Sequence, residues 1–450
     1  MKYIKHRDLI VNKSLYKVIL KISIPLMIGE LIQRAYTLTD MFFMGKMGSI
    51  QVAALTFVDP IINGIMAIGM GLAVPMLSMV SQNIGAKNYD GAKKNIGNLI
   101  FLASILSVFI GLAGVFLSDP ILETLNAHGV LLAESSRYLK IILWGTFFTF
   151  INVCYLSIKQ AEGDTMKPLY LNIASLGLNL LLNPILIFQM NLGIKGAAIA
   201  TVVSKGFLTI YGIYDLFYKG KGLRISKKHL KISRKDFIYI LALGIPAVIT
   251  KSTSPLGNML INSYAVGYGS SVIAAVGLGN KINSILFSLG TSLSATMTTI
   301  AGQNIGAGKI KRVEEAVKKL GIISIFISLS GSVIIILFSE NILSFFTADP
   351  SIKKLTKEFF IATTPTAVAW GISQIIMGVH QGAGYTKISM YITIIRLWLL
   401  RIPLVFILGI FVGERSLWYS TAIATNAIGV ISILFYLSGL WKRKNKYIMA

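Results

Sequence analysis

The residues most able to do chemistry in this chain are carboxylates that stand inside long apolar stretches. Glu30 and Asp40 lie within the apolar segment 17–44, and Asp59 lies in the next such segment. A charged side chain in hydrocarbon costs about 3 kcal/mol on insertion scales, so each acid is a candidate functional residue. Such a carboxylate can exchange a proton or bind Na⁺. Because no carboxylate is embedded inside the apolar stretches of the second half, we expect any ion-coupling acid in the first half.

A polar stripe accompanies Asp40 on the same predicted helix. At 100° per residue, four polar residues fall on one face: Gln33, Tyr36, Thr37 and Asp40. A polar face must turn away from lipid, so this stripe is predicted to line a substrate cavity. The rise of 1.5 Å per residue puts Asp40 about 28 Å above Lys21, towards the outer surface, and Glu30 nearer the middle. The alternatives are an interfacial acid for Asp40 and a buried, protonated carboxyl for Glu30.

Amides form a second polar face on the predicted helix 168–190. Together with a serine, they follow one another at steps of three, four and four residues: Asn172, Ser175, Asn179 and Asn183. Thr201, on the next predicted helix, can meet this face. Such side chains can hold a carboxylate's proton, bind a dehydrated Na⁺, or simply join helices, and the sequence leaves these three roles open.

The second half offers different side chains near a predicted cavity. Met259, Trp370 and Met377 are large and apolar or aromatic, and such a surface suits planar organic cations. Taken singly, each is also explained by lipid contact or core packing. Lys251 and Arg396 lie deep in predicted helices, and their positive charge argues against a cation site in this half.

The composition places these residues in a membrane. Hydrophobic residues make up 54% of the chain and charged residues only 14%, against about 25% charged in an ordinary soluble domain. Twelve apolar runs are each long enough to span about 30 Å of hydrocarbon: 17–44, 52–79, 97–117, 137–158, 168–190, 194–218, 237–265, 272–300, 318–338, 358–380, 387–411 and 416–440. None has the period-2 pattern of barrel strands, so an all-α polytopic membrane protein with 12 transmembrane helices is predicted.

An internal repeat divides the chain into two halves. The segment 81–86 (SQNIGA) recurs as 302–307 (GQNIGA), and the same offset places Pro25 on Pro246. Six helices per half is an even number, so the halves are parallel repeats related by an axis along the membrane normal. We therefore expect two pseudo-symmetric six-helix lobes: an N-lobe at 1–218, a cytoplasmic linker at 219–236 and a C-lobe at 237–450.

The basic residues indicate the orientation. Loops on the side of the termini hold 28 of the 43 Lys and Arg residues, and the opposite loops hold 8. Cytoplasmic loops retain such residues, which predicts a multi-pass protein of the cell membrane with both termini in the cytoplasm. The net charge of +25 is then a topology signal with some attraction for anionic membrane lipid, and no nucleic acid partner is expected.

The sequence does not indicate a disulfide, a zinc site or a catalytic centre. The single cysteine, Cys154, and four scattered histidines give no disulfide or zinc ligand spacing. No Ser/His/Asp set, carboxylate pair or phosphate-binding loop stands out, so we expect no catalytic residues, no enzyme activity and no cofactor beyond a coupling ion. The chain is expected to act as a monomer.

Several motifs together resemble the multidrug and toxic compound extrusion (MATE) family over essentially the whole chain. They are Ile24-Pro25 followed by Asp40 and Gly45, the repeated segment at 81–86, Gly163-Asp-Thr165, residues 179–184 and residues 196–201. The resemblance implies an antiporter that exports cationic amphipathic compounds in exchange for H⁺ or Na⁺ by alternating access. It also implies that Asp40 is the coupling acid and that Asn179 and Thr201 support it. Asn183 stands where many members have aspartate, and Glu30 could supply that charge instead.

Two sets of candidate residues follow. The ion-coupling set is Asp40, Glu30, Asn179, Asn183 and Thr201, with a possible Na⁺ site at Asp40, Asn179, Asn183 and Thr201. The substrate-cavity set is Gln33, Tyr36, Thr37, Asn172, Met259, Trp370 and Met377, and the expected partners are small organic cations. Two other functions stay open, namely a lipid-linked sugar flippase of the same superfamily, which should need an arginine-rich cavity, and a membrane sensor without transport.

Overall fold

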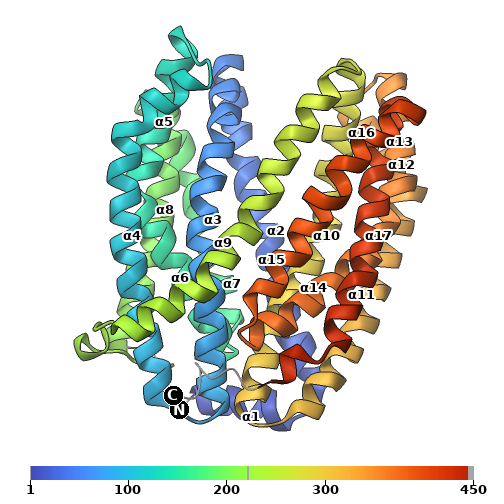
Figure 1. Ribbon diagram of the computed structural model, residues 1–450. Coiled ribbons are helices and arrows are strands. Elements are labelled where there is room, and N and C mark those ends of the chain that lie inside the picture. The colour runs from blue at the N-terminus through green and yellow to red at the C-terminus, as the bar shows by residue number, and fades with distance from the viewer. Residues whose placement is uncertain (1, 220–221, 444–450) are drawn as a thin grey trace.

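A computed structural model describes residues 2–219 and 222–443, and within these residues the secondary structure is helical, with no strand. Two lobes of long helices stand side by side (Figure 1). They meet at the end where α1 (Lys2–Asn12) lies and diverge towards the other end (Figure 1). We call the end where the lobes meet the closed end.

The N-lobe consists of helices from the first repeat. They are α2 (Leu15–Met47), α3 (Ser49–Gly85), α4 (Tyr89–Thr124), α5 (Gly129–Trp144), α6 (Thr146–Glu162), α7 (Met166–Pro184), the π-helical turn η1 (Ile185–Gln189), α8 (Ile194–Tyr214) and the π-helical turn η2 (Asp215–Lys219). A short 3₁₀ turn, η3 (Lys227–His229), lies in the connection to the second repeat.

The C-lobe consists of helices from the second repeat. They are α9 (Arg234–Val266), α10 (Ser270–Gly306), α11 (Ile310–Leu337), α12 (Ser339–Phe346), α13 (Pro350–Thr363), η4 (Thr364–Thr366), α14 (Ala367–Gly382), α15 (Thr386–Ile394), the π-helical stretch η5 (Ile395–Arg401), α16 (Ile402–Val412), η6 (Gly413–Arg415), α17 (Ser416–Leu437) and η7 (Leu440–Lys442).

These helices account for all twelve predicted spans. Among the described residues, nine helical stretches are long and apolar enough to cross a membrane, or ten if the bent pair α5–α6 is one span. One of them, Thr386–Leu437, contains two spans, because α16 packs back against α17. The remaining span is α2, whose charged residues, such as Glu30 and Arg34, lower its hydropathy. The predicted fold class is confirmed.

One helix from each repeat packs on both lobes, with a proline at the changeover. The first turns of α2, with Leu15 and Ile19, belong to a core cluster of the C-lobe, whereas Met44 beyond Pro25 belongs to an N-lobe core. The first turns of α9 do the reverse. Proline removes a backbone donor and bends a helix, so such a residue suits a helix that changes its packing partner.

The packing of α9 matches that of α2 with the lobes exchanged. Tyr239, Ile240 and Leu243 pack in an N-lobe core, whereas Ile261 beyond Pro246 packs in a C-lobe core. In Figure 1, α9 correspondingly runs from the closed end of the N-lobe across to the C-lobe. Each lobe is therefore completed by half a helix from the other repeat.

The repeated segments at 81–86 and 302–307 join the two lobes at the closed end. Gln82 Nε2 donates to the carbonyl of Gly382 at 2.6 Å, and Gln303 Nε2 donates to the carbonyl of Ala161 at 2.7 Å. Both glutamines are buried. Sequence repetition thus marks the contact surface between the lobes.

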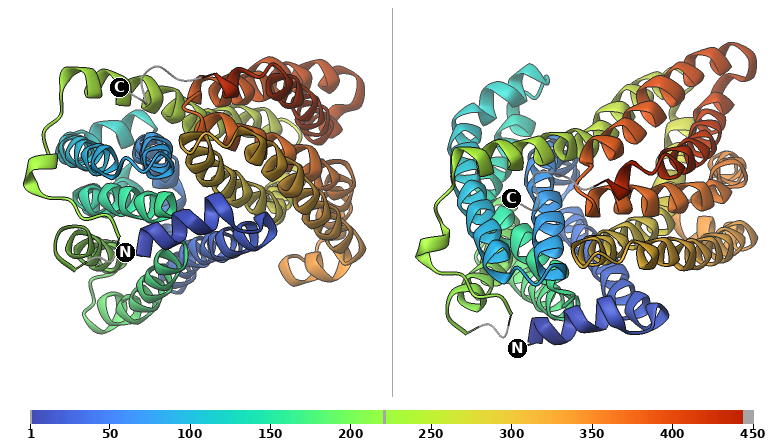
Figure 2. Two further views of the ribbon diagram at one scale, coloured as in Figure 1. Left: turned by 90° about the horizontal axis from the view of Figure 1, so that it is seen from below. Right: turned by 60° about the horizontal axis from the view of Figure 1, so that its bottom comes forward.

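The N-terminal helix α1 adds a second connection at the same end. Figure 2 shows it lying across the ends of the spanning helices. The Arg7 guanidinium donates to the carbonyls of Ile84 at 3.0 Å and Gly85 at 2.6 Å in the N-lobe. Arg312 of the C-lobe donates to the carbonyl of Ile10 in α1 at 3.1 Å. The helix therefore bridges the two lobes.

A buried ion network fastens the connection between the repeats to the N-lobe. Lys159 Nζ lies 3.1 Å from a Glu162 oxygen and 2.9 Å from an Asp215 oxygen, and all three side chains are at most 5% exposed. Glu162 also accepts the backbone N–H of Leu223 at 2.7 Å. Leu223 and Ile225 are buried in the N-lobe core. The described part of the predicted linker thus packs on the N-lobe.

Candidate functional site

Asp40 lies at the centre of a polar network inside the N-lobe and is 8% exposed. Asn183 Nδ2 donates to Asp40 Oδ1 at 3.3 Å, and Thr201 Oγ1 donates to Oδ2 at 3.4 Å, both long hydrogen bonds. Asn183 Nδ2 also donates to Asn179 Oδ1 at 3.1 Å. The structure thus brings together four residues from α2, α7 and α8 that the sequence placed on three separate segments.

Helix periodicity explains why α7 presents its amides to Asp40. Asn179 and Asn183 are four residues apart, so both point to the same side of α7, and both are fully buried. Ser175, one turn earlier, donates to the Ser204 carbonyl of α8 at 3.1 Å and holds the two helices together. The π-helical turn η1 follows directly after Pro184, and such turns are frequent at functional sites.

One acceptor in the network has no partner. Asn183 Oδ1 is buried and accepts no hydrogen bond from the residues that the structure describes. A charged carboxylate only accepts hydrogen bonds, but a protonated one must also donate. Because Nδ2 of this amide faces Asp40, rotation of the amide would bring Oδ1 to the carboxylate, where it could accept a hydrogen bond from the protonated acid or contribute an oxygen to a bound Na⁺.

Lys205 is a member of the site that the sequence patterns do not single out. Its ammonium lies 5.9 Å from the centre of the Tyr36 ring and interacts electrostatically with Asp40. Tyr36 is buried, and its hydroxyl donates to the Thr201 carbonyl at 3.5 Å. The signal available in the sequence was the four-residue step from Thr201 to Lys205, which puts both on one face of α8.

Three of the predicted cavity residues lie outside this network. Gln33 and Thr37 have exposed side chains, and Thr37 Oγ1 bonds back to the Gln33 carbonyl at 3.4 Å. Asn172 is half-buried near the start of α7. The polar stripe of α2 is thus divided, because Tyr36 and Asp40 pack against α8 whereas Gln33 and Thr37 remain accessible.

Glu30 lies away from the Asp40 network. It lies ten residues before Asp40, about 15 Å away along α2, so it does not supply negative charge beside Asn183. It interacts electrostatically with Lys251 of α9 instead. Glu30 and Lys251 are equivalent positions of the two repeats, each five residues after the proline where its helix changes lobes. The expectation that Glu30 replaces the missing aspartate is corrected accordingly.

The three cavity residues predicted in the C-lobe have different surroundings. Met377 is 4% exposed and packs in a core cluster with Ile388 and Ile392, so it is core and not cavity wall. Met259 is 59% exposed. Trp370 is held by its indole N–H, which donates to the Phe287 carbonyl at 3.2 Å. The placement of Met377 corrects the prediction for that residue, and the cavity role of Met259 and Trp370 stays a prediction.

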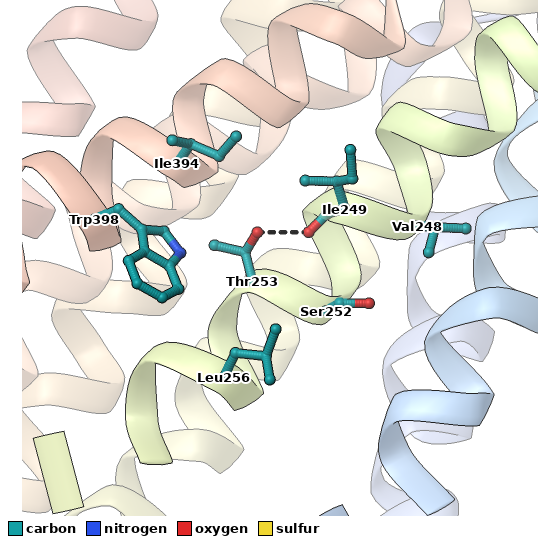
Figure 3. A pocket seen from close by; sticks show the side chains of 7 residues that line it. All are labelled: Val248, Ile249, Ser252, Thr253, Leu256, Ile394 and Trp398. Atoms are coloured by element: carbon teal, nitrogen blue, oxygen red, sulfur yellow. Dashed lines mark hydrogen bonds between the residues drawn. The ribbon is translucent and has the colours of Figure 1, made fainter. Parts of the chain in front are cut away.

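A pocket of about 410 Å³ lies in the C-lobe between α9 and the α15–η5 segment (Figure 3). Its walls are mainly apolar: Val248, Ile249, Ser252, Thr253, Leu256, Ile394 and Trp398. The hydroxyl of Thr253 is engaged with the Ile249 carbonyl of its own helix. The pocket is therefore suited to an apolar group.

Comparison with known proteins agrees with this architecture. The model of the MatE family matches residues 25–185 and 246–407, which is most of the chain. The two matches begin at Pro25 and Pro246, the equivalent residues of the two repeats. The family model therefore detects the same duplication as the internal offset.

Relatives with known names match this chain over nearly their whole length. The chain is 26% identical to a probable multidrug resistance protein, YoeA, from Bacillus subtilis, over 94% of this chain and 93% of YoeA. It is 25% identical to the multidrug export protein MepA from Staphylococcus haemolyticus, over 95% and 94% of the two chains. A crystal structure of MATE in the straight conformation matches with a TM-score of 0.92 at 25% identity, covering 98% of this chain and 99% of that one.

Proposed function

This chain belongs to the MatE family of membrane transporters, and we propose that it exports cationic amphipathic drugs or toxic compounds in exchange for H⁺ or Na⁺. Its relatives are named as multidrug resistance and multidrug export proteins, which supports drug export as the activity. We further propose that it works as a monomer in the cell membrane, with both termini in the cytoplasm.

The observation that carries the proposal is the burial of Asp40 among amides and a hydroxyl. A lone carboxylate inside a lobe can be neutralised by one proton or one Na⁺. When Asp40 is charged, Asn183 Nδ2 and Thr201 Oγ1 donate to it. When it is protonated, a rotation of the Asn183 amide that exchanges Nδ2 for Oδ1 would let Oδ1 accept from it, so the same side chain can serve both states. Asp40 is therefore the proposed coupling residue.

Alternating access then requires that the closed end opens. The direct contacts made by the repeated segments are hydrogen bonds between neutral groups, such as that from Gln82 to the Gly382 carbonyl, and the guanidinium groups of Arg7 and Arg312 add the bridge through α1. Each neutral hydrogen bond contributes only about 1 kcal/mol net, because water can replace it. We propose that ion exchange at Asp40 and breakage of these contacts alternate, with substrate carried between the lobes.

The test is export of a fluorescent cation from proteoliposomes. Purified protein is reconstituted, loaded with ethidium, and exposed separately to a pH gradient and a Na⁺ gradient. We expect one gradient to drive export in the wild type and Asp40→Asn to abolish that coupled export. The ion that drives export identifies the coupling ion.

A matched control separates Asp40 from any other embedded acid. Asp59 also lies in an N-lobe spanning helix, and Asp59→Asn makes the same chemical change. Full gradient-driven export by Asp40→Asn would show that the coupling assignment is wrong. Absence of export by folded wild-type protein under either gradient would overturn the transport proposal itself.

A further inference from the structure

Two arginines of the C-lobe lie in η5 without an acidic partner. Arg401 is 6% exposed, and its Nη1 donates to the neutral amide oxygen of Asn258 at 2.9 Å. Arg396 Nη2 approaches the hydroxyl of Ser254 at 3.5 Å, and its guanidinium stands over the Trp370 ring at 4.6 Å. Neither arginine takes part in an ion pair among the described residues.

The two guanidinium groups form a concentrated positive charge. Both arginines are charged at neutral pH, and the two groups repel each other electrostatically. Removing such charges from water without a counter-charge is unfavourable. The face of the Trp370 ring offsets part of this desolvation cost for Arg396. The acceptor described for Arg401 is the neutral amide of Asn258. A bound anion would supply the counter-charge that these two guanidinium groups lack among the described residues.

The free donors have the geometry that binds anions. The Nε atoms of both arginines are buried and have no acceptor among the residues described by the structure. Nε and one Nη of a guanidinium form a planar fork that matches two oxygens of a carboxylate, sulfonate or phosphate. A buried donor without an acceptor is costly, so an oxygen ligand from outside the chain would be favoured here.

The first repeat has no such pair. In this part of the chain the offset between the repeats is the one that places Pro184 on Pro403. The same offset places Gly177 on Arg396 and Leu182 on Arg401. Because the N-lobe helix packs without charge at these positions, the arginines are not required by the helix architecture that the two lobes share.

An apolar pocket lies on the same two elements. Its lining residues Ile394 and Trp398 stand two positions from Arg396, and Ser252 and Leu256 stand two positions from Ser254, so the pocket faces the side of these helices opposite to Arg396 and Ser254 (Figure 3). We propose that Arg396 and Arg401 together bind the carboxylate, sulfonate or phosphate group of an anion that is not part of the chain. The site goes beyond the proposed drug–ion exchange and does not depend on Asp40.

The test measures binding without any ion gradient, so its outcome is independent of whether export occurs. Protein in nanodiscs of phosphatidylcholine is titrated with 8-anilinonaphthalene-1-sulfonate, and energy transfer from tryptophan is recorded. The matched uncharged probe is N-phenyl-1-naphthylamine, which lacks only the sulfonate. We expect saturable binding of the sulfonate, at least about tenfold tighter than binding of the uncharged probe.

Variants locate the binding site. Arg401→Gln and Arg396→Gln should each weaken sulfonate binding about tenfold, whereas Arg401→Lys, which keeps charge but loses the fork, should weaken it less. Lys281→Gln removes an accessible base of α10 in the same lobe and should leave the affinity unchanged. Thermal unfolding of each variant shows whether it is folded.

A further arm separates a lipid headgroup from a soluble anion. Replacing part of the phosphatidylcholine with phosphatidylglycerol should weaken sulfonate binding competitively if a lipid phosphate occupies the site, and should leave it unchanged if the ligand is soluble. Both results keep the anion site. Equal affinity of the wild type for the two probes, or sulfonate affinity unaltered in folded Arg401→Gln, would overturn the proposal.

Discussion

Gln82 and Gln303 make the same hydrogen bond in opposite directions across the two lobes. The sequence offset that relates Gln82 to Gln303 also relates their acceptors, the carbonyls of Ala161 and Gly382. Each glutamine therefore reaches from its own repeat to the equivalent carbonyl of the other. The contact between the lobes at the closed end is pseudo-symmetric at the level of individual atoms.

Removal of either glutamine should loosen the closed end. Gln82→Ala leaves the Gly382 carbonyl without its amide donor, and Gln303→Ala does the same to Ala161, at a cost of about 1–3 kcal/mol each. We expect faster hydrogen exchange in segments 78–86 and 299–307, and more in the double variant. Gln189→Ala, at an exposed site, serves as the control. Unaltered exchange in the double variant would contradict this role.

Two glycines allow the lobes to approach at the same place. A Cβ atom at Gly85 would collide with the backbone carbonyl of Gln303, and one at Gly306 would collide with that of Gln82. Because backbone cannot give way as a side chain can, we expect Gly85→Ala to separate the lobes and lower Tm by several degrees. Gly177→Ala is the control, since its Cβ meets open space. Equal Tm values for the two variants would show that the close approach is dispensable.

The sequence predicted the fold and much of the N-lobe site for a physical reason. Span length and apolar content are local properties, so the twelve helices could be recognised one by one. The four-residue spacing of Asn179 and Asn183 is also local, and it fixes their common face before any tertiary contact is known. The position of Asp40 opposite them came from family resemblance.

Contacts between distant segments could not be predicted in the same way. The repeat drew attention to Gln82 and Gln303, but no local pattern shows that each binds a carbonyl of the other lobe. Lys205 was one of several embedded bases, and only the packing of α8 on α2 places it near Asp40. Met377 resembled a cavity residue because methionine suits both a cavity and a core, and only packing distinguishes the two.

The buried ion network should be essential for stability. Lys159→Met would leave the carboxylates of Glu162 and Asp215 buried. Asp215 would keep Lys167, but Glu162 would lose its only described ammonium partner, at a cost of about 3–5 kcal/mol. We expect a large fall in Tm and faster exchange of the Leu223 amide, which Glu162 binds.

A surface pair provides the comparison for that network. Lys93 pairs with Asp90, whose side chain is 93% exposed, so Lys93→Met should change stability by less than about 1 kcal/mol. The triple replacement Lys159→Met, Glu162→Gln, Asp215→Asn should recover part of the lost stability, because no buried carboxylate is left charged and Lys167, which loses Asp215, is 26% exposed. A Tm for Lys159→Met equal to that of Lys93→Met would show that the network does not hold the linker.

Lys205 should weaken the binding of the coupling cation at Asp40. Its positive charge interacts with Asp40, so a proton or Na⁺ must bind against it. Lys205→Gln removes this charge and with it a repulsion of about 1 kcal/mol, and we expect the ion concentration for half-maximal ethidium export to fall about fivefold. Lys195→Gln changes an exposed base of the same helix and should leave that concentration unaltered. If Lys205→Gln also left it unaltered, Lys205 would have no influence on ion binding, and its contact with Tyr36 would be structural.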